Sequence, residues 1–160
     1  MREGVALALF LFSTIDASAG GRLAPGDGAI LPLEESKELL RQCSRGAPQG
    51  VTGTWAPTVM QIRELEDRLP TALTAVALEK GERYAEPGDF RRQYAGFVVN
   101  GRKIIYVNAF PRSVGGPSPG RSFDWHRSAV MVCDGGPAFF GVVYDPEKRT
   151  FDHFQFNGPA

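Results

Sequence analysis

The residues of this chain best suited to acid–base or nucleophilic chemistry are its two histidines and the acids beside them. Asp124, Trp125 and His126 are consecutive, and Asp152 precedes His153. A hydrolase also needs a nucleophile near its base and acid, and the candidates are Ser113, Ser118, Ser122 and Ser128. No serine lies in a G-x-S-x-G elbow. Neighbouring strand residues point to opposite faces, so Asp152 is poorly placed to orient His153.

A second set of candidate residues lies at the polar end of a predicted hairpin, residues 90 to 110. Asn100-Gly101 is a strong two-residue turn signal, and the resulting register places Gln93 opposite Asn108. Arg91 shares their face, whereas Arg92 lies on the other. Donors of this kind could bind an anionic or carbonyl-bearing group, or could simply solvate the end of the strands. The predicted binding residues are Arg91, Gln93, Tyr106, Asn108 and Trp125.

Two further residues of the candidate surface have alternative explanations. Trp125 lies in a segment rich in Gly and Pro; it could contact a partner, as exposed aromatic residues often do, or cap the core. Gly96 interrupts the first strand of the hairpin, which weakens a strand unless something packs closely there. Its bare backbone could receive a bulky neighbouring side chain, mark a sheet bend, or receive a ligand.

The cysteines and histidines do not predict a metal site. Two Cys and two His without close spacing fit zinc ligation poorly, so we expect no metal and no cofactor. Asp134-Gly135-Gly136 lacks the repeated carboxylates of an EF-hand and the Lys of a P-loop, and we interpret it as a turn. The cysteines, Cys43 and Cys133, are predicted to form a disulfide across about 90 residues.

Two helices are predicted to position these candidates. Pro32 and two following acids favour a helix that ends near Gly46, with Leu33, Leu40 and Cys43 on one face. Residues 47 to 57 are predicted to form a loop. Thr58 and Gln61 form a capping box for a longer helix that Pro70 should kink or split. Its core-facing stripe is predicted to be Ile62, Leu65, Leu69, Leu73 and Val76.

The second half of the chain predicts strands. The hairpin is followed by expected strands at residues 128–133, 138–144 and 150–156, with turns at 134–137 and 145–148. Predicted inward-facing residues are Val132, Phe140, Val142, Tyr144, Phe154 and Phe156. The sequence therefore predicts an α+β fold, with one or two N-terminal helices packed on a four- to five-stranded antiparallel meander.

The N-terminus has the features of an export signal. An apolar run from Val5 to Ile15 precedes Ala17-Ser18-Ala19, a small-x-small cleavage pattern, and the run is too short to span a bilayer. We expect a signal peptide at residues 1–19, a flexible leader at 20–31 and one domain at 32–160, with no membrane span in the mature chain. Eighteen basic and eighteen acidic residues give no reason to expect nucleic-acid binding.

Three stretches carry a resemblance to known proteins. The combination of GTWAPT, YAGFVVNGRKIIYVNAF and VMVCDGGPAFFGVVYDPEKRTF behind a signal peptide resembles small exported bacterial proteins that are usually left uncharacterised. The helix-then-meander order is also similar to cystatin-like domains. However, Gln93-Tyr94-Ala95-Gly96 is one residue short of the cystatin Q-x-V-x-G loop and lacks its Val, so inhibition of proteases is not carried over.

These features together predict a non-enzymatic binding protein of the cell envelope, either periplasmic or secreted. Its partner would be an envelope protein, as for an inhibitor or immunity factor, or a small ligand. The alternative is a small secreted hydrolase that uses His126 or His153. Self-association through an exposed strand edge is a third possibility.

Overall fold

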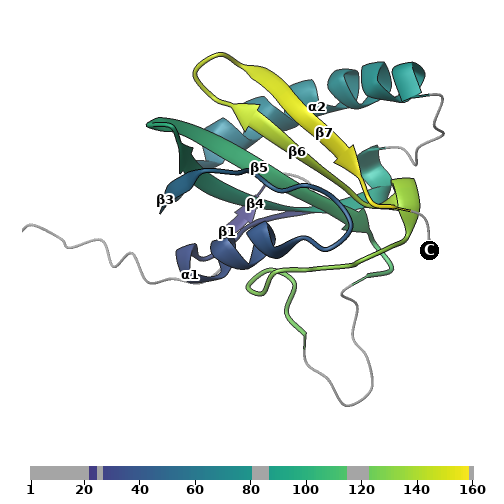
Figure 1. Ribbon diagram of the computed structural model, residues 1–160, viewed down its shortest axis with the longest axis horizontal. Coiled ribbons are helices and arrows are strands. Elements are labelled where there is room, and N and C mark those ends of the chain that lie inside the picture. The colour runs from purple at the N-terminus through teal and green to yellow at the C-terminus, as the bar shows by residue number, and fades with distance from the viewer. Residues whose placement is uncertain (1–21, 25–26, 81–86, 115–122, 159–160) are drawn as a thin grey trace, which may run out of the picture.

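The strands at the N-terminal end of the described chain are short, and the central strands are longer. The computed structural model describes residues 22–24, 27–80, 87–114 and 123–158, so the predicted signal peptide lies outside the described residues. In chain order (Figure 1) the elements are β1 Arg22–Ala24, β2 Gly28–Ile30, α1 Leu33–Ser36, η1 Lys37–Arg41, β3 Val51–Trp55, α2 Val59–Lys80, η2 Pro87–Asp89, β4 Phe90–Val99, β5 Arg102–Pro111, η3 Gly136–Ala138, β6 Phe140–Asp145 and β7 Thr150–Phe156.

The central hairpin forms as its turn predicts. Asn100 and Gly101 both have positive φ, +50° and +75°, which a two-residue turn of this type requires. The register pairs Val99 with Arg102 and Gln93 with Asn108. The predicted pairing of β4 with β5 is therefore confirmed over the whole hairpin.

The sheet is larger than predicted and is mixed. Within the described residues its strand order is β1-β2-β4-β5-β6-β7, with β3 paired to β4 outside this path. β2 runs parallel to β4, whereas the other pairs are antiparallel. The α+β class is confirmed, but the purely antiparallel meander is wrong because segments before and after the first helix both join β4.

Two segments that we expected to be irregular form strands. Residues 28–31 belong to the predicted flexible leader, yet Ala29 is fully buried and β2 pairs with residues 92–94. β3 lies in the predicted loop at 47–57 and pairs with the far end of β4. β2 reads Gly-Ala-Ile and has no polar–apolar alternation. β3 reads Val-Thr-Gly-Thr-Trp, a short alternating run of strand-favouring residues interrupted by glycine. Pairing with the long β4 orders both strands.

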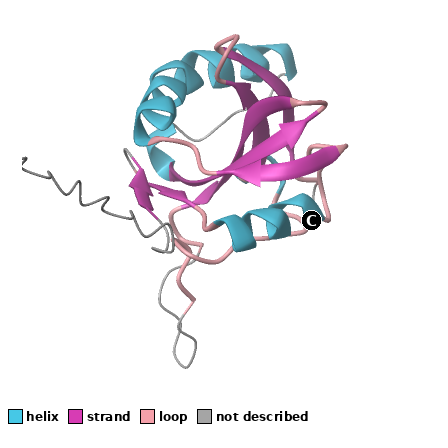
Figure 2. Ribbon diagram, turned by 90° about the vertical axis from the view of Figure 1, so that its left-hand side faces the viewer, coloured by secondary structure: helices cyan, strands magenta, loops and turns pink. Residues whose placement is uncertain are grey.

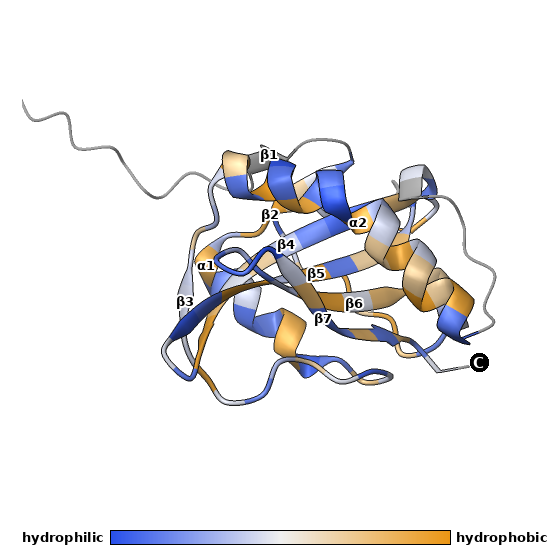
Figure 3. Ribbon diagram, turned by 90° about the horizontal axis from the view of Figure 1, so that it is seen from above, coloured by the Kyte–Doolittle hydropathy of each residue, from blue (hydrophilic) through white to orange (hydrophobic). Residues whose placement is uncertain are grey.

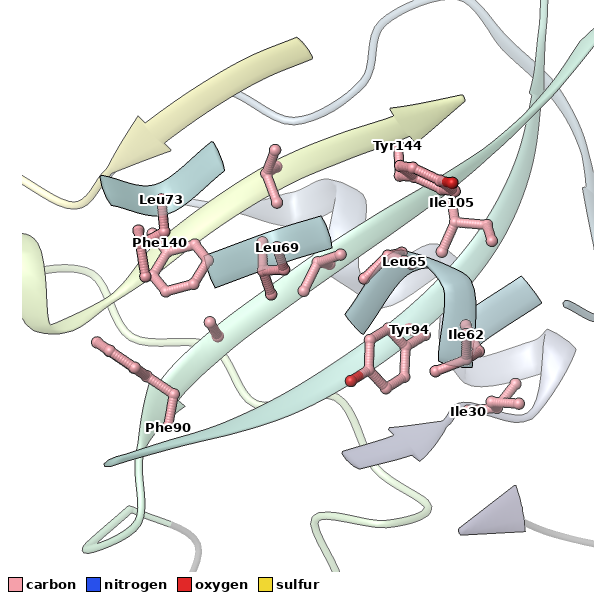
Figure 4. Packing of buried hydrophobic residues seen from close by; sticks show 13 residues of the cluster. Ile30, Ile62, Leu65, Leu69, Leu73, Phe90, Tyr94, Ile105, Phe140 and Tyr144 are labelled. Carbon is pink, nitrogen blue, oxygen red and sulfur yellow. The ribbon is translucent and has the colours of Figure 1, made fainter. Parts of the chain in front are cut away.

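The first face of the sheet is covered by α2, as Figures 2 and 3 show. The capping box is confirmed, because the Thr58 N–H donates to Gln61 Oε1 at 2.9 Å and the Gln61 N–H donates to Thr58 Oγ1 at 3.3 Å. Pro70 lies inside the helix without splitting it. The buried stripe is as predicted except at its end, where Ala77 is buried in place of Val76. Figure 4 shows its first four members, Ile62, Leu65, Leu69 and Leu73.

This stripe packs against side chains from β4, β5 and β6. Tyr94, Ile105 and Tyr144 belong to the same buried cluster, and Phe140 forms an edge contact with Phe90 at 5.1 Å between ring centroids. The predicted inward residues Phe140, Val142 and Tyr144 are buried here, and Phe154 and Phe156 pack at the margin. Val132 instead packs on the opposite face.

The second face is covered by the segment from α1 to Cys43 and by residues 123–139. Leu39 is fully buried against Ala95, Phe97 and Tyr106, whereas Leu33, which we expected on the buried face, is 42% exposed. The difference arises because α1 has a single turn and continues as a 3-10 helix, which changes the angular spacing of its side chains. Cys43 and Cys133 form the predicted disulfide between these two segments.

The predicted strand at residues 128–133 does not form. Its backbone groups bond to side chains instead: the Val130 N–H donates to Gln93 Oε1, and the Val130 carbonyl accepts from Asn108 Nδ2. The segment thus lies across the face of the sheet instead of extending it. The β-branched residues that favour a strand here are used to cover the sheet.

Trp55 explains why position 96 of β4 is a glycine. The indole packs on the glycine, and its Nε1–H donates to the carbonyls of Phe97 and Ile104 at 3.0 and 3.2 Å. Of the explanations for a glycine in this strand, packing of an aromatic side chain is confirmed.

Replacing Gly96 with alanine is expected to destabilise the protein. A Cβ there would lie 2.3 Å from the Trp55 carbonyl oxygen and 2.9 Å from the indole, so β3 must shift. Such overpacking typically lowers the free energy of unfolding by about 1–3 kcal/mol. Urea titration measures the change. Gly53→Ala is the control, because the nearest atom to a Cβ there is 3.8 Å away; equal stability of the two variants would contradict this explanation.

Candidate functional site

The structure places the five predicted binding residues in the interior. Gln93 is 0%, Tyr106 1%, Asn108 2% and Trp125 7% exposed, and Arg91 is half-buried. Gln93 and Asn108 are covered by residues 123–134, and Trp125 is part of that segment. The amide groups of Gln93 and Asn108 are therefore bonded within the protein, whereas Tyr106 lies beside a groove.

Gln93 and Asn108 hold the covering segment in place. Asn108 Nδ2 donates to Gln93 Oε1 at 3.0 Å, the predicted cross-strand amide pair. Gln93 Nε2 also donates to the carbonyls of Trp125 and Ser128, at 2.6 and 2.8 Å. These bonds satisfy backbone groups that would otherwise be buried without partners. The two amides thus take the place of a neighbouring strand.

Trp125 caps the core from this segment. Its ring forms an edge contact with Phe110 at 5.9 Å, and the Arg91 guanidinium carbon lies 5.0 Å from the ring centroid. Arg91 Nη1 also donates to the Val114 carbonyl. Arg91 and Trp125 therefore contact each other directly, and the core-capping explanation of Trp125 accounts for its position.

Arg45 is the centre of a second buried network that the sequence does not indicate. Its guanidinium donates to the side-chain oxygens of Asn108 and Asn157 and, at 3.2 Å, to the Tyr106 hydroxyl. Asn157 Nδ2 in turn donates to the carbonyls of Val132 and Asp134. Arg45 is 9% exposed, and no carboxylate pairs with it among the described residues. A buried cation therefore lies behind Tyr106 without a counter-ion.

Arg92, on the opposite face, belongs to a buried ion pair with α2. Its Nη2 lies 2.8 Å from Glu66 Oε2, and the Tyr94 hydroxyl donates to Glu66 Oε1 at 2.7 Å. Burial raises the pKa of Glu66, and the neighbouring Arg92 limits the rise. Burial and the Glu66 charge hold the pKa of Tyr94 well above its ordinary value. This cluster attaches α2 to β4.

The raised pKa of Glu66 predicts a pH dependence of stability. A carboxyl group whose pKa is higher in the folded state contributes most stability below its unfolded pKa, near 4.5, and that contribution decreases as pH rises through the folded pKa. We therefore expect wild type to lose more stability between about pH 4.5 and neutrality than Glu66→Gln. Urea midpoints across this range measure the difference, and parallel curves for the two proteins would contradict it.

One concave site lies on the second face of the sheet, at the end where β5 begins. A groove of about 500 Å³ opens between the loop at residues 46–49, the start of β5 and the strands β6 and β7. Tyr106, Ile104 and Val143 line it on the sheet side, and Pro48 lines it on the loop side. Its volume falls within the range of small-molecule sites. Among the predicted binding residues, Tyr106 belongs to this groove.

Charged residues surround the groove from two turns. Arg102 follows the Asn100-Gly101 turn, and Asp145 and Lys148 belong to the turn between β6 and β7. β5 and β6 are antiparallel, with Ile105 opposite Tyr144, so both turns lie at the same end of the sheet. Asp152, His153 and Gln155 of β7 complete the wall.

A bulge in β7 brings Asp152 and His153 to the same side of the sheet. Asp152 pairs with Val143 and Gln155 pairs with Gly141, so two residues of β7 lie opposite Val142 alone. His153 has φ +50° at this point. The bulge re-aims the side chains, and His153 Nε2 lies 3.6 Å from Asp152 Oδ2. The expectation that the two side chains point to opposite faces is therefore wrong, but 3.6 Å is longer than a hydrogen bond and would not orient the ring.

The other histidine lies apart from the groove. His126 Nδ1 is 3.0 Å from Asp124 Oδ1, which also accepts the His126 backbone N–H. These hydrogen bonds lower the pKa of Asp124. Of the serines considered as nucleophiles, Ser118 and Ser122 lie outside the described residues.

Across the described ranges, no cluster of three or more His, Cys, Asp or Glu residues could hold a metal ion. In the same ranges, no helix is both long and apolar enough to cross a membrane. No protein-family model, no curated protein and no solved structure matches the chain.

The sequence did not indicate the groove. In the predicted meander, a strand at 128–133 separates the strands at 102–110 and 138–144, so the turns at 100–101 and 145–148 would lie at opposite ends of the sheet. Because that strand does not form, β6 pairs antiparallel with β5 and both turns lie at one end. The loop at 46–49 had no signal in the sequence either. It reaches the groove because Cys43 is bonded to Cys133 and Arg45 is bonded to Asn108.

Proposed function

We propose that the protein is an exported, non-enzymatic binding protein of the cell envelope, periplasmic or secreted, and that it binds a small ligand in the groove beside Tyr106. The observation that carries the proposal is the groove itself, about 500 Å³ in volume, with apolar residues on its walls and charged residues at its margin. Concave sites that combine apolar walls with a few polar groups are the usual form of ligand pockets.

Export is supported by the predicted signal peptide and by the disulfide. Cys43 and Cys133 are bonded, and disulfides persist mainly in oxidising compartments outside the cytosol. A protein partner, as for an inhibitor or immunity factor, was the other expectation from the sequence. The groove favours a small ligand over such a partner, because the aromatic residue proposed as an anchor, Trp125, is buried.

Native mass spectrometry of the protein purified from exporting cells tests this proposal. We expect a bound small molecule in wild type and its loss in Thr150→Trp, because Thr150 lines the groove and an indole there would fill it. Thr71→Trp, at an exposed position of α2, is the matched control and should keep the molecule. Absence of any bound molecule, or its retention by Thr150→Trp, would contradict the proposal.

A hydrolase that uses His153 is the second candidate, and the bulge in β7 is the observation that favours it. Asp152 and His153 both line the groove, with a ring nitrogen 3.6 Å from a carboxylate oxygen, and the Thr150 hydroxyl lies on the same wall. A panel of nitrophenyl esters tests this candidate. If His153 is catalytic, wild type and His126→Ala hydrolyse an ester of the panel and His153→Ala does not. Absence of hydrolysis by wild type, or hydrolysis by His153→Ala, rejects this candidate.

A further inference from the structure

We infer that the ligand of the groove is an anion with an apolar or aromatic body, such as an aryl or acyl carboxylate or sulfonate. This inference rests on the proposed function and specifies the chemical class of its ligand. It follows from which charges around the groove are already bonded within the protein and which are not.

The two cations at the margin of the groove are free to bind. Arg102 and Lys148 both line it, and both side chains are exposed. Within the described part of the chain, neither side chain forms an ion pair or a hydrogen bond. The neighbouring Arg149 differs, because it is paired with Glu64 of α2 on the opposite face. The turn therefore directs one cation to the helix and leaves Lys148 for the groove.

The two acids of the groove, Asp145 and Asp152, each accept hydrogen bonds from backbone N–H groups that are close in sequence. Asp145 Oδ1 accepts the backbone N–H groups of Glu147 and Lys148, each at 3.0 Å. Asp152 Oδ1 accepts the N–H of His153 at 2.8 Å, and its other oxygen faces the His153 ring. Among the described residues, neither carboxylate forms an ion pair with Arg102 or Lys148, because each is held toward backbone N–H groups or the His153 ring.

A third cation, Arg45, contacts Tyr106 in the wall of the groove and adds positive charge near it. The Arg45 Nε–H donates to the hydroxyl of Tyr106, whose side chain lines the groove. Arg45 is buried, and its hydrogen-bond partners among the described residues are the neutral side chains of Tyr106, Asn108 and Asn157. Charges in the interior are screened less than exposed ones, so Arg45 makes the groove more favourable for an anion.

The residues that line the walls of the groove determine the polarity of the uncharged part of the ligand. Val99, Ile104 and Val143 line the sheet side, and Ala47 and Pro48 lie across from them. An ion without an apolar part would leave these walls exposed to water. The residues therefore favour a ligand with an apolar body between the walls and its negative group toward Arg102 and Lys148.

A matched pair of fluorescent probes tests the inference. Anilinonaphthalene sulfonate carries an anionic group on an aromatic body, and phenylnaphthylamine has a similar body without the charge. We expect wild type to bind the sulfonate more tightly than the neutral amine. In Arg102→Gln/Lys148→Gln, sulfonate binding should weaken about tenfold, the effect of losing two partly exposed charge contacts, and amine binding should stay unchanged.

The controls separate the inference from the proposal on which it depends. Arg63→Gln/Arg127→Gln removes two exposed cations elsewhere and should leave both affinities unchanged, while circular dichroism checks that every variant is folded. If both probes bind wild type equally, or if Arg102→Gln/Lys148→Gln keeps its sulfonate affinity, the anionic class is wrong. If Thr150→Trp binds both probes as tightly as wild type, the groove is not the site and the proposed function fails.

Discussion

Replacing Arg45 with methionine is expected to lower the free energy of unfolding by about 3 kcal/mol. The substitution leaves the side-chain oxygens of Asn108 and Asn157 without the donor that they have in wild type. Each buried unsatisfied group costs about 1–3 kcal/mol, and removing the cost of burying the cation offsets part of the loss. Urea-induced unfolding followed by tryptophan fluorescence measures the change.

Arg41→Met is the matched control for this prediction. Arg41 is 72% exposed in its side chain and pairs only with Glu38 on the surface, a contact worth at most about 1 kcal/mol. Arg45→Lys should resemble Arg45→Met, because an ammonium cannot reproduce the planar fork that reaches three acceptors. If Arg45→Met is as stable as Arg41→Met, the network does not have the structural role assigned to it.

Removing the disulfide is expected to have an effect of similar size. Cys43 and Cys133 are 90 residues apart, and a crosslink that closes a loop of this length contributes about 4 kcal/mol in the chain-entropy model. We therefore expect Cys43→Ser/Cys133→Ser to unfold at a much lower urea concentration than wild type. The two segments that cover the second face of the sheet would be joined only by hydrogen bonds and packing.

Reduction of the wild-type protein provides the control for the disulfide. Dithiothreitol should lower the stability of wild type to that of the double serine variant and should leave the variant itself unchanged. A shift smaller than about 1 kcal/mol on reduction would show that the disulfide is not a main source of stability. Gly46, three residues after Cys43, lines the groove, so ligand affinity should fall with the disulfide as well.

The elements that the sequence predicted well are those determined by local chemistry. Asn100-Gly101 specifies its own turn and so the register of β4 with β5. Thr58 and Gln61 start α2, and its apolar spacing identifies the buried stripe except at Val76. The disulfide followed from there being two cysteines behind an expected export signal.

The errors arise where distant segments determine the structure. β2 could not be identified from its own residues, because it is ordered by pairing with β4. The same holds for the covering residues 128–133, whose backbone bonds to the side chains of Gln93 and Asn108. The role of the Gln93 and Asn108 amides cannot be inferred from nearby residues for the same reason. A polar residue at a strand end resembles a ligand-binding group until the segment that buries it is known, and for Gln93 that segment lies more than 30 residues away.

The groove could not be predicted from the sequence. The expected strand at 128–133 would place Arg102 and Lys148 at opposite ends of the sheet, whereas β6 in fact pairs directly with β5. The bulge at His153 has no signature in the residues around it. Without that bulge, Asp152 and His153 would point to opposite faces. The loop at 46–49 depends on Arg45, whose burial is also not evident from its neighbours in sequence.

The central claim is that the groove beside Tyr106 is the ligand site, and amide chemical-shift mapping tests it most directly. The isotope-labelled protein is titrated with anilinonaphthalene sulfonate and each backbone N–H is followed. The account predicts the largest shifts in the loop at residues 46–49, at Arg102 and along β7 from Thr150 to Gln155. Shifts concentrated on α2 or on residues 123–134, with the groove unaffected, would contradict it.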